Sequence, residues 1–365
     1  MKALIRKSVL AVNPYVPGKP IEETKRQLGL KEVIKLASNE NSWGASPKAI
    51  RAIKRSLLGV NRYPDAQGFY LKKRLARFFG LVPENFVLGN GSDELIDVII
   101  KTFLEADENI ITSEGTFLEY QIIAQVNERK IKKASLRYFK YDLNAILKLV
   151  DKKTKLIFIA NPNNPTGTYV TKDEVAEFIK ALPESVIVVF DEAYDAFIDV
   201  DDFPSSLSYL KKKKNVIILR TFSKAYGLAG LRLGYAIAAP ELVTYLERIR
   251  QPFNVNLLAQ VAGLAALEDK DFLNKTRRLT LEGKDLIYQE LSKMGLGFVP
   301  SVANFILIDV GRDSREVFKA CLKFGVIIRD MAQYGLVNFI RVTIGTQKEN
   351  RRFLRVLRKV MKEKG

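Results

Sequence analysis

Short apolar runs separated by amphipathic stretches fill the middle of the chain, from about residue 85 to residue 240. Continuous runs of this length, rich in Val, Ile and Leu, are typical of strands buried on both faces of a largely parallel sheet. The stretches between them place apolar residues at three- and four-residue intervals, which predicts helices that cover the sheet. The strands are expected at 85–88, 109–112, 156–160, 186–190, 216–219 and 234–237, with helices at stretches such as 92–104 and 172–182. The sequence therefore predicts an open α/β domain.

The pattern changes after about residue 267. A long charged helix is followed by short strands at 304–307 and 339–342, and apolar residues recur at helical spacing within the basic stretch 350–364. This order predicts a smaller α+β domain. No flexible linker separates the two patterns, so a continuous helix is expected to join the domains. We assign residues 31–270 to the large domain, and residues 1–30 and 271–365 to an N-terminal arm plus the small domain.

Composition narrows the class of protein. A chain of 365 residues with 47% hydrophobic content is long enough for two domains around a sizeable core. No segment approaches the roughly 20 apolar residues of a membrane span, and basic residues near the start precede any signal-like run, so a cytoplasmic protein without membrane contact is expected. The single cysteine, Cys321, excludes an intramolecular disulfide. The absence of histidine disfavours a histidine-liganded metal site, and we expect no metal.

The formal charge of +18 could attract nucleic acid or anionic metabolites. Much of this charge lies in the lysine run 211–214, which is expected to be a solvated loop, and on the outer face of the C-terminal helix. No helix-turn-helix precedes Asn39, so a nucleic-acid-binding regulator remains only as the alternative from another class, and we expect no nucleic acid partner.

Polar motifs follow four of the predicted strands, where open α/β sheets bind their ligands. The glycine-rich stretch 89–94 opens a helix and fits either a phosphate site or an ordinary capped helix with Ser92 or Asp93 as the N-cap. Residues 161–168 form a proline-containing turn that presents Asn164. Asp191 begins a third motif and could bind a ligand or a metal, or cap a helix. Lys224 ends the fourth, 221–224, where a lone lysine is usually solvated.

Taken together and in this order, the four motifs resemble the fold-type-I pyridoxal phosphate (PLP) enzymes, and among them the histidinol-phosphate aminotransferase branch of the class I/II aminotransferases. The resemblance extends over nearly the whole chain. It includes the stretches 35–41 (KLASNEN), 62–65 (RYPD), 251–256 (QPFNVN) and 341–346 (RVTIGT). It implies a large, mostly parallel-sheet α/β domain with a smaller α+β domain, and PLP as the cofactor.

The resemblance also implies a role for each matching residue. Lys224 would hold PLP as a Schiff base and then carry the proton at the substrate α-carbon. Asp191 would face the pyridine nitrogen, and Asn164 and Tyr194 would hydrogen-bond the phenolic oxygen. Phe117 would stack on the ring. The cofactor phosphate would be bound by Ser92, Asp93, Thr221, Ser223 and Arg232.

Substrate and partner residues follow in the same way. Arg341 matches the arginine that binds the α-carboxylate or its equivalent on the donor. Arg329 and Tyr15 match positions near the distal phosphate, although ordinary surface or hinge packing would also explain them, and Asn39 is assigned to the substrate site. Tyr63 matches a tyrosine that reaches the neighbouring subunit's phosphate site, which implies a homodimer with shared active sites.

The expected reaction is transamination between L-histidinol phosphate and 2-oxoglutarate, giving imidazole acetol phosphate and L-glutamate in histidine biosynthesis. An aromatic amino-acid aminotransferase and a threonine-phosphate decarboxylase are the alternatives within the enzymes, and a catalytically inactive scaffold is a further one. Two stretches depart from the branch's usual pattern. Ser42-Trp43-Gly44 replaces a proline-containing turn, and Gly115 stands where proline usually precedes the threonine.

Overall fold

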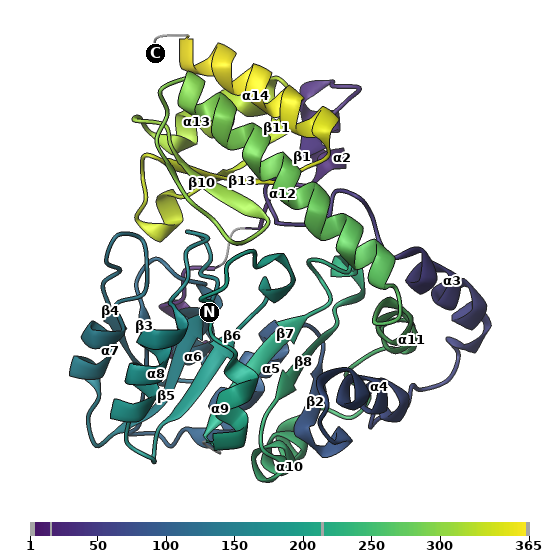
Figure 1. The fold of residues 1–365 in the computed structure, drawn as a ribbon, viewed down its shortest axis with the longest axis vertical. Helices are drawn as coiled ribbons and strands as arrows, with labels where there is room; N and C mark the ends of the chain where they lie inside the picture. The colour runs from purple at the N-terminus through teal and green to yellow at the C-terminus, as the bar shows by residue number, and fades with distance from the viewer. Residues whose placement is uncertain (1–3, 15–16, 213–214, 363–365) are drawn as a thin grey trace.

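A seven-stranded sheet forms the centre of the molecule (Figure 1). The computed structural model describes residues 4–14, 17–212 and 215–362. The antiparallel strand β8 pairs with β2 and β7, and every other neighbouring pair in the sheet is parallel. In spatial order the strands are β2 (Phe86–Gly89), β8 (Gly234–Ile237), β7 (Val216–Thr221), β6 (Ile187–Asp191), β5 (Thr154–Ala160), β3 (Asn109–Ser113) and β4 (Lys130–Ala134). The predicted α/β fold class is confirmed.

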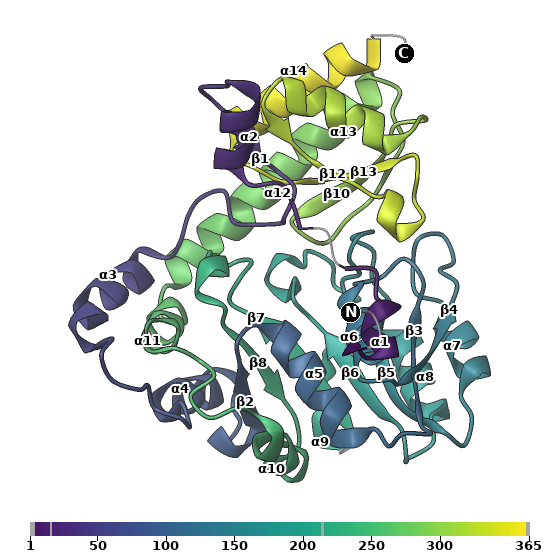
Figure 2. The same cartoon turned by 180° about the vertical axis from the view of Figure 1, so that it is seen from behind.

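Helices cover both faces of this sheet, which explains why the strand sequences are apolar throughout. Every residue of β2, β3, β6 and β8 is buried. Helices α7, α8 and α9 lie over one face, and α5 and α6 lie over the other (Figures 1 and 2). The bounds are α5 (Ser92–Phe103), α6 (Glu119–Val126), α7 (Leu143–Leu149), α8 (Lys172–Ala181) and α9 (Ser206–Lys212). Flanking helices are α3 (Pro47–Ser56), α4 (Phe69–Phe79), α10 (Pro240–Ile249) and α11 (Leu257–Ala266).

Strand β4 was not expected from the sequence. Its residues, Lys-Ile-Lys-Lys-Ala, are mostly charged, and only Ala134 is fully buried. The strand lies at the edge of the sheet beside β3. Charged side chains on an edge strand discourage pairing with other chains, and they also remove the apolar signal that predicts a strand.

The C-terminal unit is a four-stranded antiparallel sheet with helices packed against it (Figure 1). Its order is β12 (Arg329–Asp330), β13 (Phe339–Thr343), β10 (Phe305–Asp309) and β9 (Phe298–Val299). The helices are α12 (Lys270–Lys293), α13 (Ser314–Lys323) and α14 (Gln347–Lys362). Helix α12 runs without a break from the large unit into the small one, as expected, and the smaller α+β unit is confirmed.

The basic terminal helix α14 packs as its spacing predicts. Phe353, Leu357 and Val360 are buried in the core of the small unit, so much of the positive charge lies on the outer face. Within the described part of the chain, no helix is both long and apolar enough to cross a membrane.

The N-terminal segments lie on both units. Strand β1 (Ile34–Lys35) pairs in parallel with β11 (Val326–Ile327), and Leu36 packs in the core of the small unit. Residues 34–36 therefore lie with the small unit, beyond the boundary at residue 31 that the sequence suggested. Helix α2 (Ile21–Leu28) is beside them (Figure 2), whereas α1 (Lys7–Leu10) lies over α6, where Arg6 forms an ion pair of 3.1 Å with Glu128. The division into domains stays a prediction.

The stability of the large unit should depend on its buried strand residues. Leu219, in β7, is 0% exposed, whereas Leu28, at the end of α2, is 41% exposed. We expect Leu219→Ala to lower the free energy of unfolding by about 3 kcal/mol, because it removes buried methyl groups and leaves a cavity. Leu28→Ala, the matched control, should cost much less. Thermal and urea unfolding of both variants measure the difference, and equal losses would contradict this description of the core.

Candidate active site

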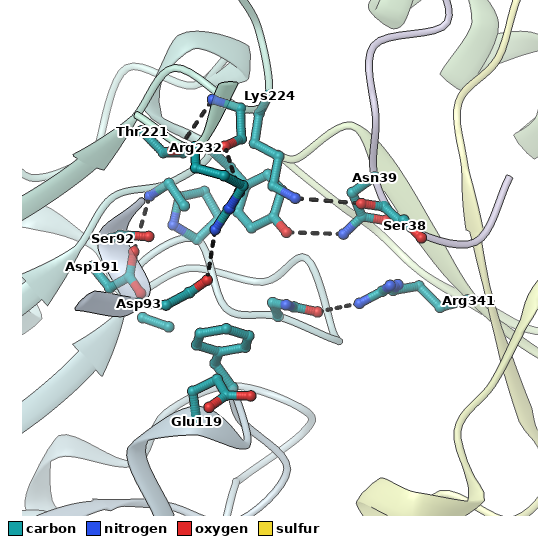
Figure 3. A pocket seen from close by; sticks show the side chains of 17 residues that line it. Ser38, Asn39, Ser92, Asp93, Glu119, Asp191, Thr221, Lys224, Arg232 and Arg341 are labelled. Carbon is teal, nitrogen blue, oxygen red and sulfur yellow. Dashed lines mark hydrogen bonds and ion pairs between the residues drawn. The ribbon is translucent and has the colours of Figure 1, made fainter. Parts of the chain in front are cut away.

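The carboxyl ends of β5, β6 and β7 meet at the edge of the large sheet that faces the small unit. The loops after these strands line a cavity of about 260 Å³ (Figure 3). Twelve of the predicted site residues line it: Asn39, Ser92, Asp93, Phe117, Asn164, Asp191, Tyr194, Thr221, Ser223, Lys224, Arg232 and Arg341. Residues more than 300 positions apart in the sequence are thus brought to one cavity.

Lys224 follows β7 by three residues, and its amine lies inside the cavity (Figure 3). The Nζ atom donates a hydrogen bond of 3.3 Å to the carbonyl of Ser38 and lies 5.6 Å from the centre of the Tyr194 ring. The Ser38 carbonyl belongs to the segment that crosses between the two units. A lysine in this position is presented to a ligand rather than to bulk solvent, so the functional interpretation of Lys224 is favoured over a solvated surface lysine.

Asp191 is the last residue of β6 and is only 5% exposed. Burial is the main cause that raises its pKa to about 6, and the charge of Asp93 acts in the same direction. A hydrogen bond of 2.7 Å from the Tyr120 hydroxyl opposes this shift. Tyr120 is fully buried and stacks on Phe158 at 5.0 Å. The tyrosine therefore fixes the carboxylate's orientation, a role that sequence reasoning missed.

Ion pairs of Arg220 join the ends of β6 and β7. Arg220 Nη2 lies 2.7 Å from a carboxylate oxygen of Glu192, and Nη1 lies 2.7 Å from Asp195. The Glu192 side chain is 2% exposed, so this pair is largely shielded from solvent. Because Glu192 directly follows Asp191 and Arg220 precedes Thr221, the pair ties two parts of the cavity wall together. Neither residue was expected from the sequence to have this role.

Arg341 faces Lys224 across the cavity from β13 and is 4% exposed. One terminal nitrogen donates to the side-chain oxygen of Asn164, and the other donates to the carbonyl of Ala37 at 2.8 Å. Its buried Nε has no hydrogen-bond partner among the described residues. Because an unpaired buried donor is unfavourable, this guanidinium is suited to an anionic group of a ligand. Asn164 lies in a turn in which both proline peptide bonds are cis.

Asn39 connects the small unit to Tyr194. Its backbone has φ of 54°, in the left-handed region, and it is 1% exposed. The amide Nδ2 donates to the Tyr194 hydroxyl at 2.9 Å, and the backbone N–H donates to Thr343 Oγ1 at 2.9 Å. Asn304 adds a hydrogen bond of 3.1 Å to the Asn39 carbonyl. Thr343 and Asn304 were not expected in the site, because they act only through Asn39.

The start of α5 and the segment after β7 together form a group of donors around one end of the cavity. We call this group the phosphate cup, and it consists of Gly91, Ser92, Thr221, Ser223 and Arg232. Gly91, not Ser92 or Asp93, is the N-cap residue, so no side chain caps the helix. Gly91 has φ of 83°, in the region that favours glycine, and a Cβ atom there would lie 2.5 Å from Arg232 Nη2, so a larger residue would also displace the guanidinium. The helix N-terminus, the guanidinium and the three hydroxyls suit a phosphate group.

Two of the predicted residues that the structure describes do not line the cavity. Tyr63 is 83% exposed and stacks on Phe253 at 4.7 Å on the surface. Arg329 is 7% exposed on β12, where it is paired in register with Arg341, but it does not line the cavity. Tyr15 lies outside the described residues.

A lysine, a buried aspartate, a tyrosine–asparagine pair and a phosphate cup at this edge of the sheet are the donor set of a PLP-dependent transferase. The residues fit that cofactor, because the cup and Asp191 offer partners to its two ends within one cavity. The chain belongs to the family of class I and II aminotransferases, whose family model matches residues 31–357. It is therefore a PLP-dependent transaminase.

Relatives of known name cover almost the whole chain. The histidinol-phosphate aminotransferase of Moorella thermoacetica is 47% identical over 98% of this chain and 92% of its own length. That of Desulfotalea psychrophila is 46% identical over 100% of this chain and 97% of its own length. The crystal structure of the Sinorhizobium meliloti histidinol-phosphate aminotransferase in complex with PLP has a TM-score of 0.90 at 29% identity, with 98% of this chain and 97% of that chain covered.

The raised pKa of Asp191 predicts a pH effect in the cofactor-free protein. The folded chain holds a proton on this group up to about pH 6, whereas the unfolded chain loses it near 3.8. The contribution of Asp191 to the free energy of unfolding should therefore be largest below about pH 4 and should be lost as the pH rises through about 6. We expect Asp191→Asn to raise the melting temperature at pH 7 and to flatten the pH profile between these values. Thermal unfolding measured from pH 4 to 7 tests this, and a destabilised variant at pH 7 would contradict it.

Proposed function

We propose that this transaminase transfers the amino group of L-histidinol phosphate to 2-oxoglutarate and forms imidazole acetol phosphate and L-glutamate in histidine biosynthesis. The observation that carries the proposal is Arg341, a buried arginine with an unpaired Nε that faces Lys224 across the cavity. The names of the relatives support the same substrate. Arg329, in register with Arg341 on the neighbouring strand, offers a second cation for the distal phosphate.

The chain's own residues divide the chemistry among them. When bound, PLP supplies a ring that withdraws the electron pair left at the substrate α-carbon. Lys224 anchors the cofactor covalently and, once released, moves the proton at that carbon. The Asp191 carboxylate holds a proton at the ring nitrogen, and Tyr120 keeps the carboxylate in place. Tyr194, Asn164 and Phe117 orient the ring.

Arg341 serves both half-reactions in this proposal. Histidinol phosphate has no α-carboxylate, and its phosphate ester takes the place of that group, whereas 2-oxoglutarate presents a carboxylate. A planar guanidinium with several donors accommodates both kinds of anion. The contacts with Asn164 and Ala37 hold it in a fixed orientation, and Asn39 lies beside it as part of the substrate site.

We further propose that the working unit is a cytoplasmic homodimer with shared active sites. Large apolar side chains are exposed along the stretch after α3 and the start of α4: Leu58 at 96%, Val60 at 60%, Tyr63 at 83%, Phe69 at 54% and Tyr70 at 72%. A patch of this kind supports a protein interface. Tyr63 lies within it and would reach the phosphate cup of the partner. The use of a single cysteine is in keeping with a reducing compartment.

The substrate is tested by steady-state kinetics with 2-oxoglutarate as acceptor for histidinol phosphate and phenylalanine, and by decarboxylation for threonine phosphate. We expect the specificity constant for histidinol phosphate to be the highest by about 10- to 150-fold, because a charge-assisted phosphate contact contributes roughly 1.5–3 kcal/mol and phenylalanine lacks it. Arg329→Met should lower it about 10- to 100-fold and affect phenylalanine little. Lys224→Ala is the inactive control. A higher specificity constant for phenylalanine would overturn the substrate assignment.

The shared site is tested by mixing two inactive variants. Co-expressed Lys224→Ala and Tyr63→Ala chains should form heterodimers in which one site keeps both Lys224 and the partner's Tyr63. We expect activity to return in these heterodimers to roughly half of the wild-type level per dimer. Each variant alone should remain impaired. If Tyr63 acted within its own chain, mixing would restore nothing. Leu58→Glu should separately shift the protein toward monomers in sedimentation experiments, because it buries a charge in the proposed interface.

A further inference from the structure

A carboxylate is paired with one terminal nitrogen of the arginine in the phosphate cup. Asp93, the second residue of α5, accepts a hydrogen bond of 2.9 Å from Arg232 Nη2. The two side chains are 45% and 44% exposed, respectively. The same guanidinium also lies 3.5 Å from Ser223 Oγ and against Gly91, so it closes the cup from one side (Figure 3). Asp93 thus binds the group that a phosphate would use.

The position of Asp93 sets up a competition between anions. An exposed ion pair of this kind contributes only about 0–1 kcal/mol, so a ligand with several further contacts can displace the carboxylate. A free phosphate would gain the helix N-terminus and the three hydroxyls of the cup, but it would face the negative charge of Asp93 at short range. The field of this carboxylate extends through the cavity, because it contributes to the raised pKa of both Asp191 and Glu119.

We propose that Asp93, which the resemblance placed among the phosphate-binding residues, acts through its carboxylate as a selectivity residue of the cup: the carboxylate holds Arg232 in the cofactor-free protein and disfavours free phosphate. PLP overcomes this barrier, because its ring and its bond to Lys224 add contacts that inorganic phosphate cannot make. Discrimination against a competing ligand by an unfavourable charge is a general route to specificity. The inference rests on the proposed role of the cup in binding the cofactor phosphate.

A purely structural role for Asp93 makes a different prediction. An acidic side chain in the first turn of a helix stabilises the helix through its dipole, and its removal costs a few tenths to about 1 kcal/mol of stability. In that case the neutral variant would be slightly less stable, and its affinity for anions would not increase. Affinity for phosphate therefore separates the two roles.

The test compares Asp93→Asn with the wild type, both stripped of cofactor, by calorimetric titration with inorganic phosphate in a phosphate-free buffer. Two charges about 5 Å apart near a protein surface interact strongly enough to change an affinity roughly tenfold. We expect Asp93→Asn to bind phosphate about tenfold more tightly. We also expect phosphate to slow PLP uptake more in this variant, measured by the absorbance of the bound cofactor.

Asp97→Asn is the matched control, because it removes the same charge one turn further along α5. Asp97 forms an ion pair of 2.5 Å with Lys101 and a hydrogen bond of 2.9 Å with Asn127, away from the cup. The Asp97→Asn variant should therefore bind phosphate as weakly as the wild type. Circular dichroism checks folding, and Asp93→Ser, a neutral residue suited to a helix start, provides a second variant.

Phosphate affinity in the Asp93 variants that is no higher than in the wild type would overturn the inference. Equal gains in the Asp93 and Asp97 variants would overturn it as well, because they would reflect net charge alone. Failure of the wild-type protein to bind PLP would instead overturn the cofactor role of the cup. The two kinds of failure are therefore distinguishable.

Discussion

The crossing segment Leu36–Asn39 is the constraint on which the rest of the site depends. Leu36 is hydrogen-bonded to two strands of the small unit. Its N–H donates to the carbonyl of Ile327 in β11, and its carbonyl accepts from the N–H of Thr343 in β13. The three residues that follow then contact side chains of the cavity in turn: Ala37 accepts from Arg341, Ser38 accepts from Lys224, and Asn39 donates to Tyr194. Because one extended segment makes all three contacts, the position of the small unit and the geometry of the cavity cannot change independently.

The electrostatics of the cavity favour ligand binding over the stability of the empty protein. Asp191 is buried with a raised pKa, and Arg341 has a buried unpaired donor. Both arrangements are unfavourable without a partner of opposite charge. A cofactor with a protonatable ring nitrogen and a substrate with an anionic group supply those partners. Beneath the cavity, the shielded pair of Arg220 and Glu192 makes no such demand, because each already has its counter-ion. Asp191 and Arg341, the two groups left without such a partner here, both line the cavity.

Most of the large sheet could be predicted from the sequence, because its strands are buried on both faces and read as continuous apolar runs. Strand β4 could not, because its edge position is protected by lysines. The boundary at residue 31 stays a prediction. The pairing of β1 with β11 could not be predicted, because nothing local in residues 34–36 indicates a partner almost 300 residues away. In the site, the residues that belong to the four motifs after the strands could be named from the sequence. Tyr120 and Thr343 were given no role, because each acts through tertiary hydrogen bonds to another site residue, which no spacing along the chain encodes.

The exposed position of Tyr63 bears on the proposed dimer. Tyr63 is exposed and far from the cavity lining in a fold that otherwise gathers twelve predicted residues at one place. Its neighbours in the sequence and on the surface are also large and apolar, and an isolated chain would expose them to water at a cost in free energy. A second copy of the chain would remove this cost and deliver a hydroxyl to the phosphate cup at the same time. The proposed dimer would bury this apolar surface and add the Tyr63 hydroxyl to the partner's site, so association and catalysis should be linked.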